Sequence, residues 1–397
     1  MTRLVLTLTL VVACATPILA QEPETRAAAI AKQQDEKAAA LKPYTPNAFE
    51  KRLLAIERAG GFGLTNGWFV AWGDIKTGSG FALGPVYGKI FDNDAYFQAK
   101  AAYSLRNFKL AQVMFTGPPL AGKRVTFGGR ARWQDAPTLA FYPIGPRSPK
   151  TRSDFSETKT EFSGNVAARP VRFIRLGATV GYEMFETTAP EPRDPSTQTL
   201  PLVTPGAGID PNYVHSQVIG AIDFRDGLGY SRRGTLLQAT LHDYRQQNGS
   251  GFDFQRVDGI AEQYIPILHG NWVIFLGLRA STTSVSTGNT VPLFLLPDVG
   301  GRDLRGFVNY RFRDRHSIRF MAEYRWYVQE FVDFAIFYDA GKVASRREDL
   351  DFDALKSSVG AGIRFHGPQM TAFRLEVARS NEGIRLIFAF SPVGGRQ

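Results

Sequence analysis

The chain has 397 residues, a formal net charge of +10, 30 phenylalanines and 39 glycines. Its only cysteine is Cys14, which excludes a disulfide framework and a metal site built from thiolates. No run of about 18 apolar residues follows the first 20 residues, which excludes a transmembrane helix in that part of the chain.

Residues 1–20 have the pattern of a secretory signal peptide. Arg3 precedes an apolar run over residues 4–12, and residues 17–20 resemble a cleavage site. Cys14 leaves open a lipoprotein cleavage site after a very short apolar run. Export argues against nucleic acid as a partner. We therefore assign the basic excess to a wet interior and to contacts with outer-membrane lipid and lipopolysaccharide.

Residues 21–62 are predicted to form a short helical periplasmic segment. Thr45 is a suitable N-cap before Pro46, and Gly60 ends the pattern. This helix would pack against the barrel rim, enter the lumen or dock a partner. The segment is too short for an ordinary periplasmic polypeptide-binding domain.

Residues 63–397 are dominated by alternation of apolar and polar residues. Between residues 317 and 328 the even-numbered positions are apolar and end in aromatics, whereas the odd-numbered ones include Arg319, Glu323 and Arg325. Side chains alternate across a strand, so one face is apolar and the other is charged. The repetition of this pattern along the chain is typical of a transmembrane barrel with lipid outside and water inside.

The alternation predicts an all-β fold, a sixteen-stranded antiparallel transmembrane β-barrel, in the outer membrane of a Gram-negative bacterium. Its strands are predicted at 67–75, 79–90, 94–105, 107–117, 122–134, 155–169, 171–186, 213–226, 234–246, 252–266, 271–285, 314–328, 331–343, 356–367, 370–379 and 382–391. An even count places both termini in the periplasm. The long connections 135–154, 187–212 and 286–313 then lie together on the outer side.

Four short motifs occur along this barrel. In chain order they are Asp223 and Arg225 in a hairpin closed by Gly234, Leu304-Arg305-Gly306-Phe307 in the sixth outer loop, Phe337, Asp339 and Gly341 in the thirteenth strand, and Gly360, Gly362 and Arg364 in one strand. Together they resemble the bacterial surface antigen superfamily, the outer-membrane assembly and translocation family of BamA, TamA and the two-partner-secretion transporters. The resemblance covers about residues 60–391.

The resemblance implies insertion or translocation of polypeptide, or of lipid, at the outer membrane. In that case the first and last strands meet at a weak seam that can open. The expected partners are a secreted or membrane-inserted polypeptide and a periplasmic helper protein. Two departures bear on this: Tyr230, Ser231 and Arg232 stand where the family hairpin usually has a proline, and the repeated periplasmic domains are not expected. We therefore predict a barrel-only member.

Parity predicts how the sixth-loop motif is held. Asp339 and Glu323 fall on the lumenal faces of adjacent strands, where both can reach Arg305 in forked, charge-assisted pairs. Gly306 would allow a sharp turn, Phe307 would be an apolar anchor and Gly341 would leave room for the loop tip. The alternative is that Arg305 is an exposed turn arginine and the lumenal charges pair among themselves.

Two other functions compete with the assembly reading. A passive diffusion channel would use the charged lumenal residues Arg319, Glu323, Arg325, Arg374 and Arg385. An outer-membrane enzyme would need a Ser–His pair, for which Ser216 with His242 is the sole candidate. The histidines are dispersed without metal-ligand spacing. We therefore predict no catalytic residue, no metal and no cofactor.

Overall fold

A computed structural model describes residues 30, 32–36, 66–188, 191–192, 204–227, 230–268, 271–329, 331–366 and 371–390. The chain divides into two compact units, Met1–Pro46 and Asn47–Gln397. The predicted signal peptide lies outside the described residues. Of the predicted segment 21–62 only residues 30 and 32–36 are described, and they are helical. In the described part of the chain, no helix has the length and apolar character needed to cross a membrane.

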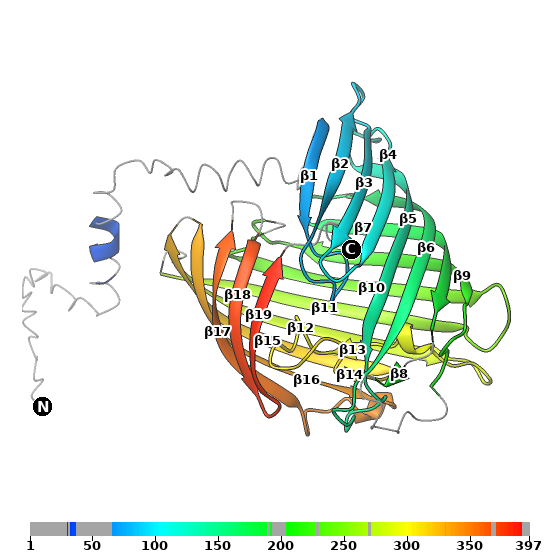
Figure 1. Cartoon of the computed structure of the whole chain (residues 1–397). Helices are drawn as coiled ribbons and strands as arrows, with labels where there is room; N and C mark the ends of the chain where they lie inside the picture. The colour runs from blue at the N-terminus through cyan, green and yellow to red at the C-terminus, as the bar shows by residue number, and fades with distance from the viewer. Residues whose placement is uncertain are drawn as a thin grey trace, which may run out of the picture. The chain divides into compact units, whose positions relative to one another are not determined.

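The second unit is an up-and-down antiparallel sheet (Figure 1). Its sixteen long strands are β1 (Gly67–Gly73), β2 (Ala82–Ile90), β3 (Tyr96–Ser104), β4 (Lys109–Thr116), β5 (Val125–Phe141), β6 (Ser153–Ala168), β7 (Ile174–Thr187), β9 (Asn212–Asp223), β10 (Gly234–Gln246), β11 (Phe254–Ile267), β12 (Trp272–Val285), β15 (His316–Gln329), β16 (Val332–Ala344), β17 (Lys356–His366), β18 (Thr371–Ser380) and β19 (Gly383–Phe390). Each pairs with the next long strand along the chain.

The predicted fold class is therefore confirmed, including the strand number. The strand boundaries agree closely, with one notable correction at β5. This strand was predicted to end at residue 134 but continues to Phe141, past a register shift between Ala136 and Leu139. The β5–β6 connection is correspondingly shorter than predicted. A bulge of this kind breaks the alternation and hides the continuing strand from a parity argument.

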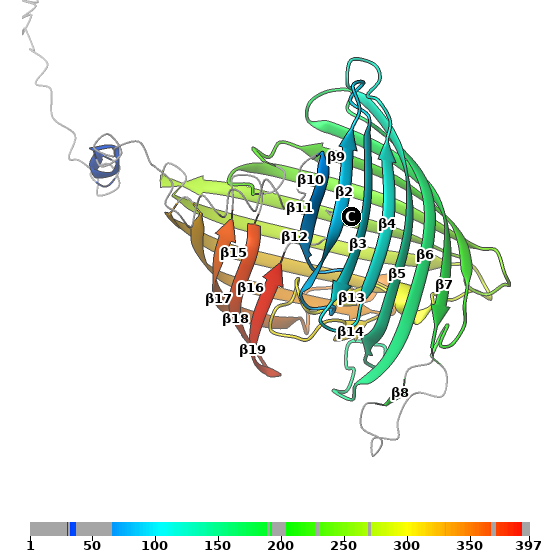
Figure 2. The same cartoon turned by 45° about the horizontal axis from the view of Figure 1, so that its top comes forward.

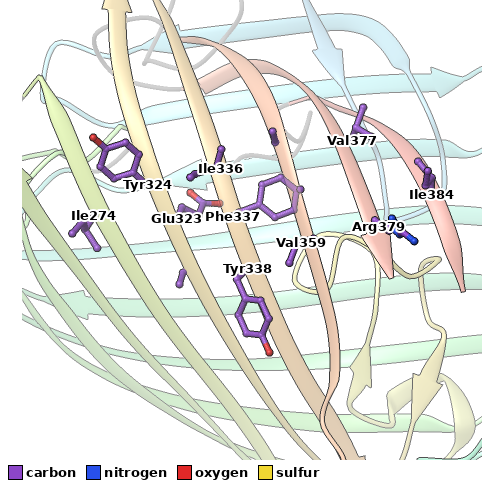
Figure 3. Close-up of a pocket in the computed structure, with 13 residues that line it drawn as sticks. Ile274, Glu323, Tyr324, Ile336, Phe337, Tyr338, Val359, Val377, Arg379 and Ile384 are labelled. Carbon is purple, nitrogen blue, oxygen red and sulfur yellow. The ribbon is translucent and has the colours of Figure 1, made fainter. Parts of the chain in front are cut away.

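The two faces of the sheet differ as the alternation predicts. On β16, Phe334, Ile336 and Tyr338 are exposed, whereas Asp333 and Asp339 are buried. The outward face suits lipid, and the inward face carries paired charges and the loops that fold against it. Figure 3 shows this wall at the outward hollow on β12 and β15–β19, with Tyr324, Ile336 and Tyr338 among its lining side chains.

The sheet ends at β1 and β19, and no register pairing joins these two described strands. Both views show them as the two edges of the curved sheet (Figures 1 and 2).

The long connection between β12 and β15, residues 286–315, is called loop six here because it is the sixth on the outer side. It contains the short 3-10 helix η2 (Leu293–Leu295) and a small ribbon of β13 (Asp298–Val299) with β14 (Phe312–Arg313). The connection β16–β17 contains the 3-10 helix η3 (Arg347–Asp349), and the two-residue strand β8 (Glu191–Pro192) pairs with β6.

Candidate functional site

Loop six carries the Arg305 motif into the interior, against the inward face of β15–β18. The motif lies in the sixth outer connection, and Phe337, Asp339 and Gly341 lie on β16, the thirteenth long strand. Both positions agree with the prediction. Arg305 is 1 % exposed, so the alternative of an exposed turn arginine is wrong.

Arg305 is bound by three carboxylates. Its Nε and Nη2 donate to the two oxygens of Asp339 at 2.8 and 2.6 Å, and its backbone N–H donates to the same carboxylate at 3.1 Å. Its Nη1 donates to Glu323 at 2.7 Å and to Glu376 at 3.1 Å. Burial by itself would lower the pKa of Arg305, but these carboxylates raise it above its ordinary value. The guanidinium therefore stays charged. We call this arrangement the clasp.

Glu376 of β18 is the clasp residue that the sequence reasoning missed. The alternation places it on the inward face of its strand, but only the tertiary structure shows that loop six reaches across to β18. The carboxylates also have partners from the wall itself. Arg364 donates to both oxygens of Glu323 at 2.8 Å and to Glu376 at 3.2 Å, and Arg325 donates to Glu323 at 2.8 Å. Positive and negative groups alternate, so each buried charge is compensated.

The glycines of the fourth motif make room for the clasp. A Cβ at Gly360 would lie 2.3 Å from the ring of Phe337, and one at Gly362 would lie 2.5 Å from Cγ of Glu376. The Phe337 ring in turn carries the Arg305 guanidinium, whose centre lies 3.4 Å from the ring centroid. Figure 3 shows Phe337 and Glu323 together on this wall. The motif of Gly360, Gly362 and Arg364 therefore leaves space for the Phe337 ring and the Glu376 side chain, and it contributes Arg364 itself.

Gly306 lies in the sharp turn predicted for it, which the N–H of Phe307 closes by donating to the carbonyl of Leu304 at 3.0 Å. The residue has no positive φ, so the turn itself does not require glycine. A Cβ at Gly306 would instead lie 2.5 Å from Cβ of Ser358 and 2.7 Å from Cβ of Ser380. Glycine is needed because the loop backbone approaches β17 and β18 closely. This contact depends on the tertiary fold and has no local signal.

Two further predictions concern the surroundings of the loop tip. Phe307 is buried with Val299, Leu304, Phe312 and Val343, so it anchors the loop as predicted. A Cβ at Gly341 would lie 3.3 Å from Val299 of loop six, which agrees with room for the loop. The tighter restraint, however, is the carbonyl of Ile318 on β15, at 2.8 Å.

The motif residues of the β9–β10 hairpin form a second ion-pair group at the opposite end of the strands. Arg225 makes a fork with Asp223, through two hydrogen bonds of 2.9 Å, and donates to Glu262 of β11 at 3.1 Å. Arg175 of β7 also pairs with Asp223, at 3.2 Å. The structure does not bring Asp223 and Arg225 into contact with Arg305.

A histidine ladder lies on the inward face of β7–β11. His215 Nδ1 contacts Glu183 at 2.9 Å, His215 Nε2 contacts His242 Nδ1 at 3.0 Å, and His242 Nε2 contacts Asp258 at 3.1 Å. Ser216 is adjacent to His215 on β9, and alternation therefore directs it to the other face. The Ser216–His242 pairing considered from sequence is wrong. Within the described ranges, no group of three or more His, Cys, Asp or Glu residues is arranged to hold a metal ion.

Comparisons with known proteins point in one direction. Residues 93–392 match the family model described as the Omp85 superfamily domain. The crystal structure of BamA from Haemophilus ducreyi lacking POTRA domains 1–3 is similar, with TM-score 0.62 and 15% identity, over 82% of this chain and 70% of that one. A comparison with curated proteins gave no match.

CdiB proteins are also similar. CdiB from Escherichia coli has a TM-score of 0.52 and 11% identity over 81% of this chain and 60% of its own. CdiB from Acinetobacter baumannii has a TM-score of 0.47 and 12% identity over 83% of this chain and 56% of its own. At these identities the likeness shows the fold alone. The family model, however, spans most of the chain. The protein belongs to the Omp85 superfamily.

Proposed function

We propose that this protein inserts polypeptides into, or translocates them across, the outer membrane of a Gram-negative bacterium. Two observations together carry the proposal. The edge strands β1 and β19, as far as the structure describes them, do not pair with each other, and an outer loop is bound inside the sheet. Loop six closes the interior while the clasp is intact, and the edges provide unpaired backbone groups for a client strand.

Loop six contacts the chain next to both edges, which gives it a direct means of controlling the seam. On the β1 side, Arg302 pairs with Asp74 and the hydroxyl of Tyr310 donates to the carbonyl of Thr77 at 3.1 Å. On the β19 side, Arg311 pairs with Glu382 at 2.9 Å. We call these contacts the seam ties.

The β19 side holds the loop tip as well. Arg385 of β19 donates to the carbonyls of Arg305, at 3.2 Å, and of Phe307. The hydroxyl of Ser380 donates to the carbonyl of Gly306 at 2.9 Å. In the proposed mechanism, displacement of loop six by a client breaks the clasp and the seam ties together. The interior and both strand edges then become available in one step.

A passive diffusion channel is less well supported by these contacts. The arginines that such a channel would use are occupied: Arg319 pairs with Asp303 of loop six at 2.6 Å, Arg325 with Glu323, and Arg385 with loop carbonyls. A lumen that binds its own loop so extensively suits a gated path better than constant diffusion. We also propose that the protein is not an enzyme. An outer-membrane enzyme should show an activity that disappears in His242→Ala.

Single-channel recording in planar bilayers tests the proposal. We expect small, irregular openings for the wild type and larger ones for Arg305→Ala, which frees the loop. Arg245→Ala is a suitable control, because it removes an exposed rim arginine that pairs with Asp243 and Asp253, away from loop six. A steady, large and ion-selective current from the wild type would contradict the proposal and support the channel.

A crosslinking experiment tests the link to the client. In a Cys14→Ser background, Asp74→Cys and Arg302→Cys would be joined by a bifunctional thiol reagent. We expect the tied protein to lose capture of client polypeptide in crosslinked envelopes and to regain it when the tie is cleaved. Equal capture in the tied and cleaved states would show that the loop does not control the path.

A further inference from the structure

The connection between β9 and β10 extends away from these two strands, and its side chains contact β15, β16 and β17. The hydroxyl of Tyr230 donates to Asp333 of β16 at 2.5 Å, and the Tyr230 ring stacks on His366 of β17 with centroids 3.8 Å apart. Arg232 lies over the ring of Tyr327 of β15, 4.2 Å from its centroid. Four strand spacings separate β10 from β16 along the sheet, which is roughly 19 Å. The hairpin must therefore cross the interior near β11, β12 and β15.

These contacts lie at the end of the barrel opposite loop six. Tyr327 is near the end of β15, Asp333 is near the start of β16 and His366 ends β17, all beside the short inner connections. Tyr230 is also where the chain departs from the hairpin pattern of the family it resembles. A residue that breaks the pattern thus makes the hairpin's long-range hydrogen bond.

Asp333 connects this hairpin to the clasp. It is directly opposite Arg364 in the register of β16 and β17. Arg364 in turn binds Glu323 and Glu376, the carboxylates that hold Arg305. Asp333 is 0 % exposed, so only neighbouring protein groups can stabilise its carboxylate through hydrogen bonds or ion pairs.

The pair Asp333 and Arg364 also has spare hydrogen-bonding capacity. Oδ1 of Asp333 and Nε of Arg364 are both buried and have no hydrogen-bond partner within the described part of the chain. Side chains directly opposite on neighbouring strands have Cβ atoms about 5 Å apart, close enough for these groups to meet after a rotamer change. In the structure Arg364 is bound toward the clasp, on Glu323 and Glu376, and a rotation toward Asp333 would give both unpartnered groups a partner.

We propose that Tyr230 is a latch that couples the inner mouth of the barrel to loop six. While its hydroxyl satisfies Asp333, Arg364 stays on Glu323 and Glu376, and the clasp is complete. When the hairpin leaves, Asp333 loses its hydrogen-bond donor and draws Arg364 away, which weakens the hold on Arg305. An event on the inner side thereby loosens the outer loop, and by linkage the reverse also holds.

The coupling makes a prediction that does not require the client to be known. The backbone N–H of Arg305 donates to Asp339, so its hydrogen-exchange rate reports on the clasp. In the folded full chain, Tyr230→Phe keeps the stacked ring and removes only the hydroxyl. We expect exchange at Arg305 to accelerate about fivefold or more, the lower range of measured couplings between sites. Tyr213→Phe is the matched control, because its buried hydroxyl has no partner within the described residues.

A second variant tests the route. Asp333→Asn preserves an acceptor for Tyr230 but removes the charge that would attract Arg364. We expect Tyr230→Phe to have no effect on Arg305 exchange in the Asp333→Asn background. Unchanged exchange at Arg305 in Tyr230→Phe alone would overturn the coupling. Equal acceleration in both backgrounds would overturn the route through Asp333. If Tyr230→Phe fails to fold, Tyr230→Leu, which has no side-chain hydrogen-bond donor, provides the same comparison. Failure of these tests leaves the proposed translocation function intact.

Discussion

The clasp and the histidine ladder are both rows of charged side chains on the inward face, but they are completed in different ways. In the ladder, every contact joins neighbouring strands between β7 and β11, so the partners all come from the sheet and none from a loop. In the clasp, three carboxylates from β15, β16 and β18 converge on one arginine from a loop.

The ladder is completed within the sheet, whereas the clasp is completed by a loop that can move away. Removing a ladder residue leaves its neighbours with other partners, because Asp258 also binds Arg256 and Ser281, and Glu183 also binds Lys159. Removing Arg305 leaves buried carboxylates short of positive charge. A site completed by a displaceable loop can therefore act as a switch, whereas the ladder mainly holds strands together.

The largest effect is expected for Arg305→Ala. The variant should lose about 3–5 kcal/mol of stability, because it breaks a buried ion-pair group from one side only. Unfolding in urea, followed by heat-modifiable gel mobility, measures this loss. Arg305→Lys should recover part of it, since lysine keeps the charge but not the fork. Wild-type stability together with a protease-resistant loop six would show that the clasp does not hold the loop.

Gly360→Ala should destabilise by about 1–3 kcal/mol. The added methyl would lie 2.2 Å from the carbonyl oxygen of Val377 and 2.3 Å from the Phe337 ring that supports Arg305. Gly259→Ala is the control on the ladder side, because a Cβ there meets nothing within 4 Å. Equal stability losses in the two variants would mean that the packing of Phe337 against Gly360 makes no particular contribution to stability.

His242→Ala should cost about 1 kcal/mol, the usual net value of a hydrogen bond whose former partners keep other contacts. Loop six should remain as protected from protease as in the wild type. The measurement is limited proteolysis of whole cells or proteoliposomes beside the unfolding curve. Release of loop six by His242→Ala would contradict the proposed difference between the histidine ladder and the clasp.

Arg302→Ala should have the smallest effect on stability, about 0–1 kcal/mol, because its seam tie to Asp74 is partly exposed. Its conductance should nevertheless show more frequent openings than the wild type. Single-channel records in high and low salt check this, since the tie should weaken as salt increases. Openings no more frequent than those of Arg245→Ala would remove the seam ties from the mechanism.

The strand pattern was accessible from the sequence because parity is a local property. Alternation placed Glu323 and Asp339 on one face and Tyr324 and Tyr338 on the other, and the structure agrees. The same reasoning predicted the Arg305 partners on β15 and β16. It missed Glu376, because the reach of loop six to β18 depends on where a long connection folds.

Gly306 and Tyr230 show the same limit. The turn predicted at Gly306 is present, but what requires glycine there is the close approach of β17 and β18, which the sequence does not show. Tyr230 stood out only as a departure from a motif. Its partner, Asp333, lies 103 residues away in the chain.

The sequence by itself determined the number of strands, their faces and the residues that can bear charge in the interior. These follow from two-residue periodicity and from the cost of placing polar groups in lipid. Only the tertiary structure decided which charges meet, because a loop and a hairpin cross the interior to reach strands that are distant in sequence. That the described strands β1 and β19 do not pair with each other likewise depends on how the whole sheet curves, since each edge strand taken alone has an ordinary strand pattern.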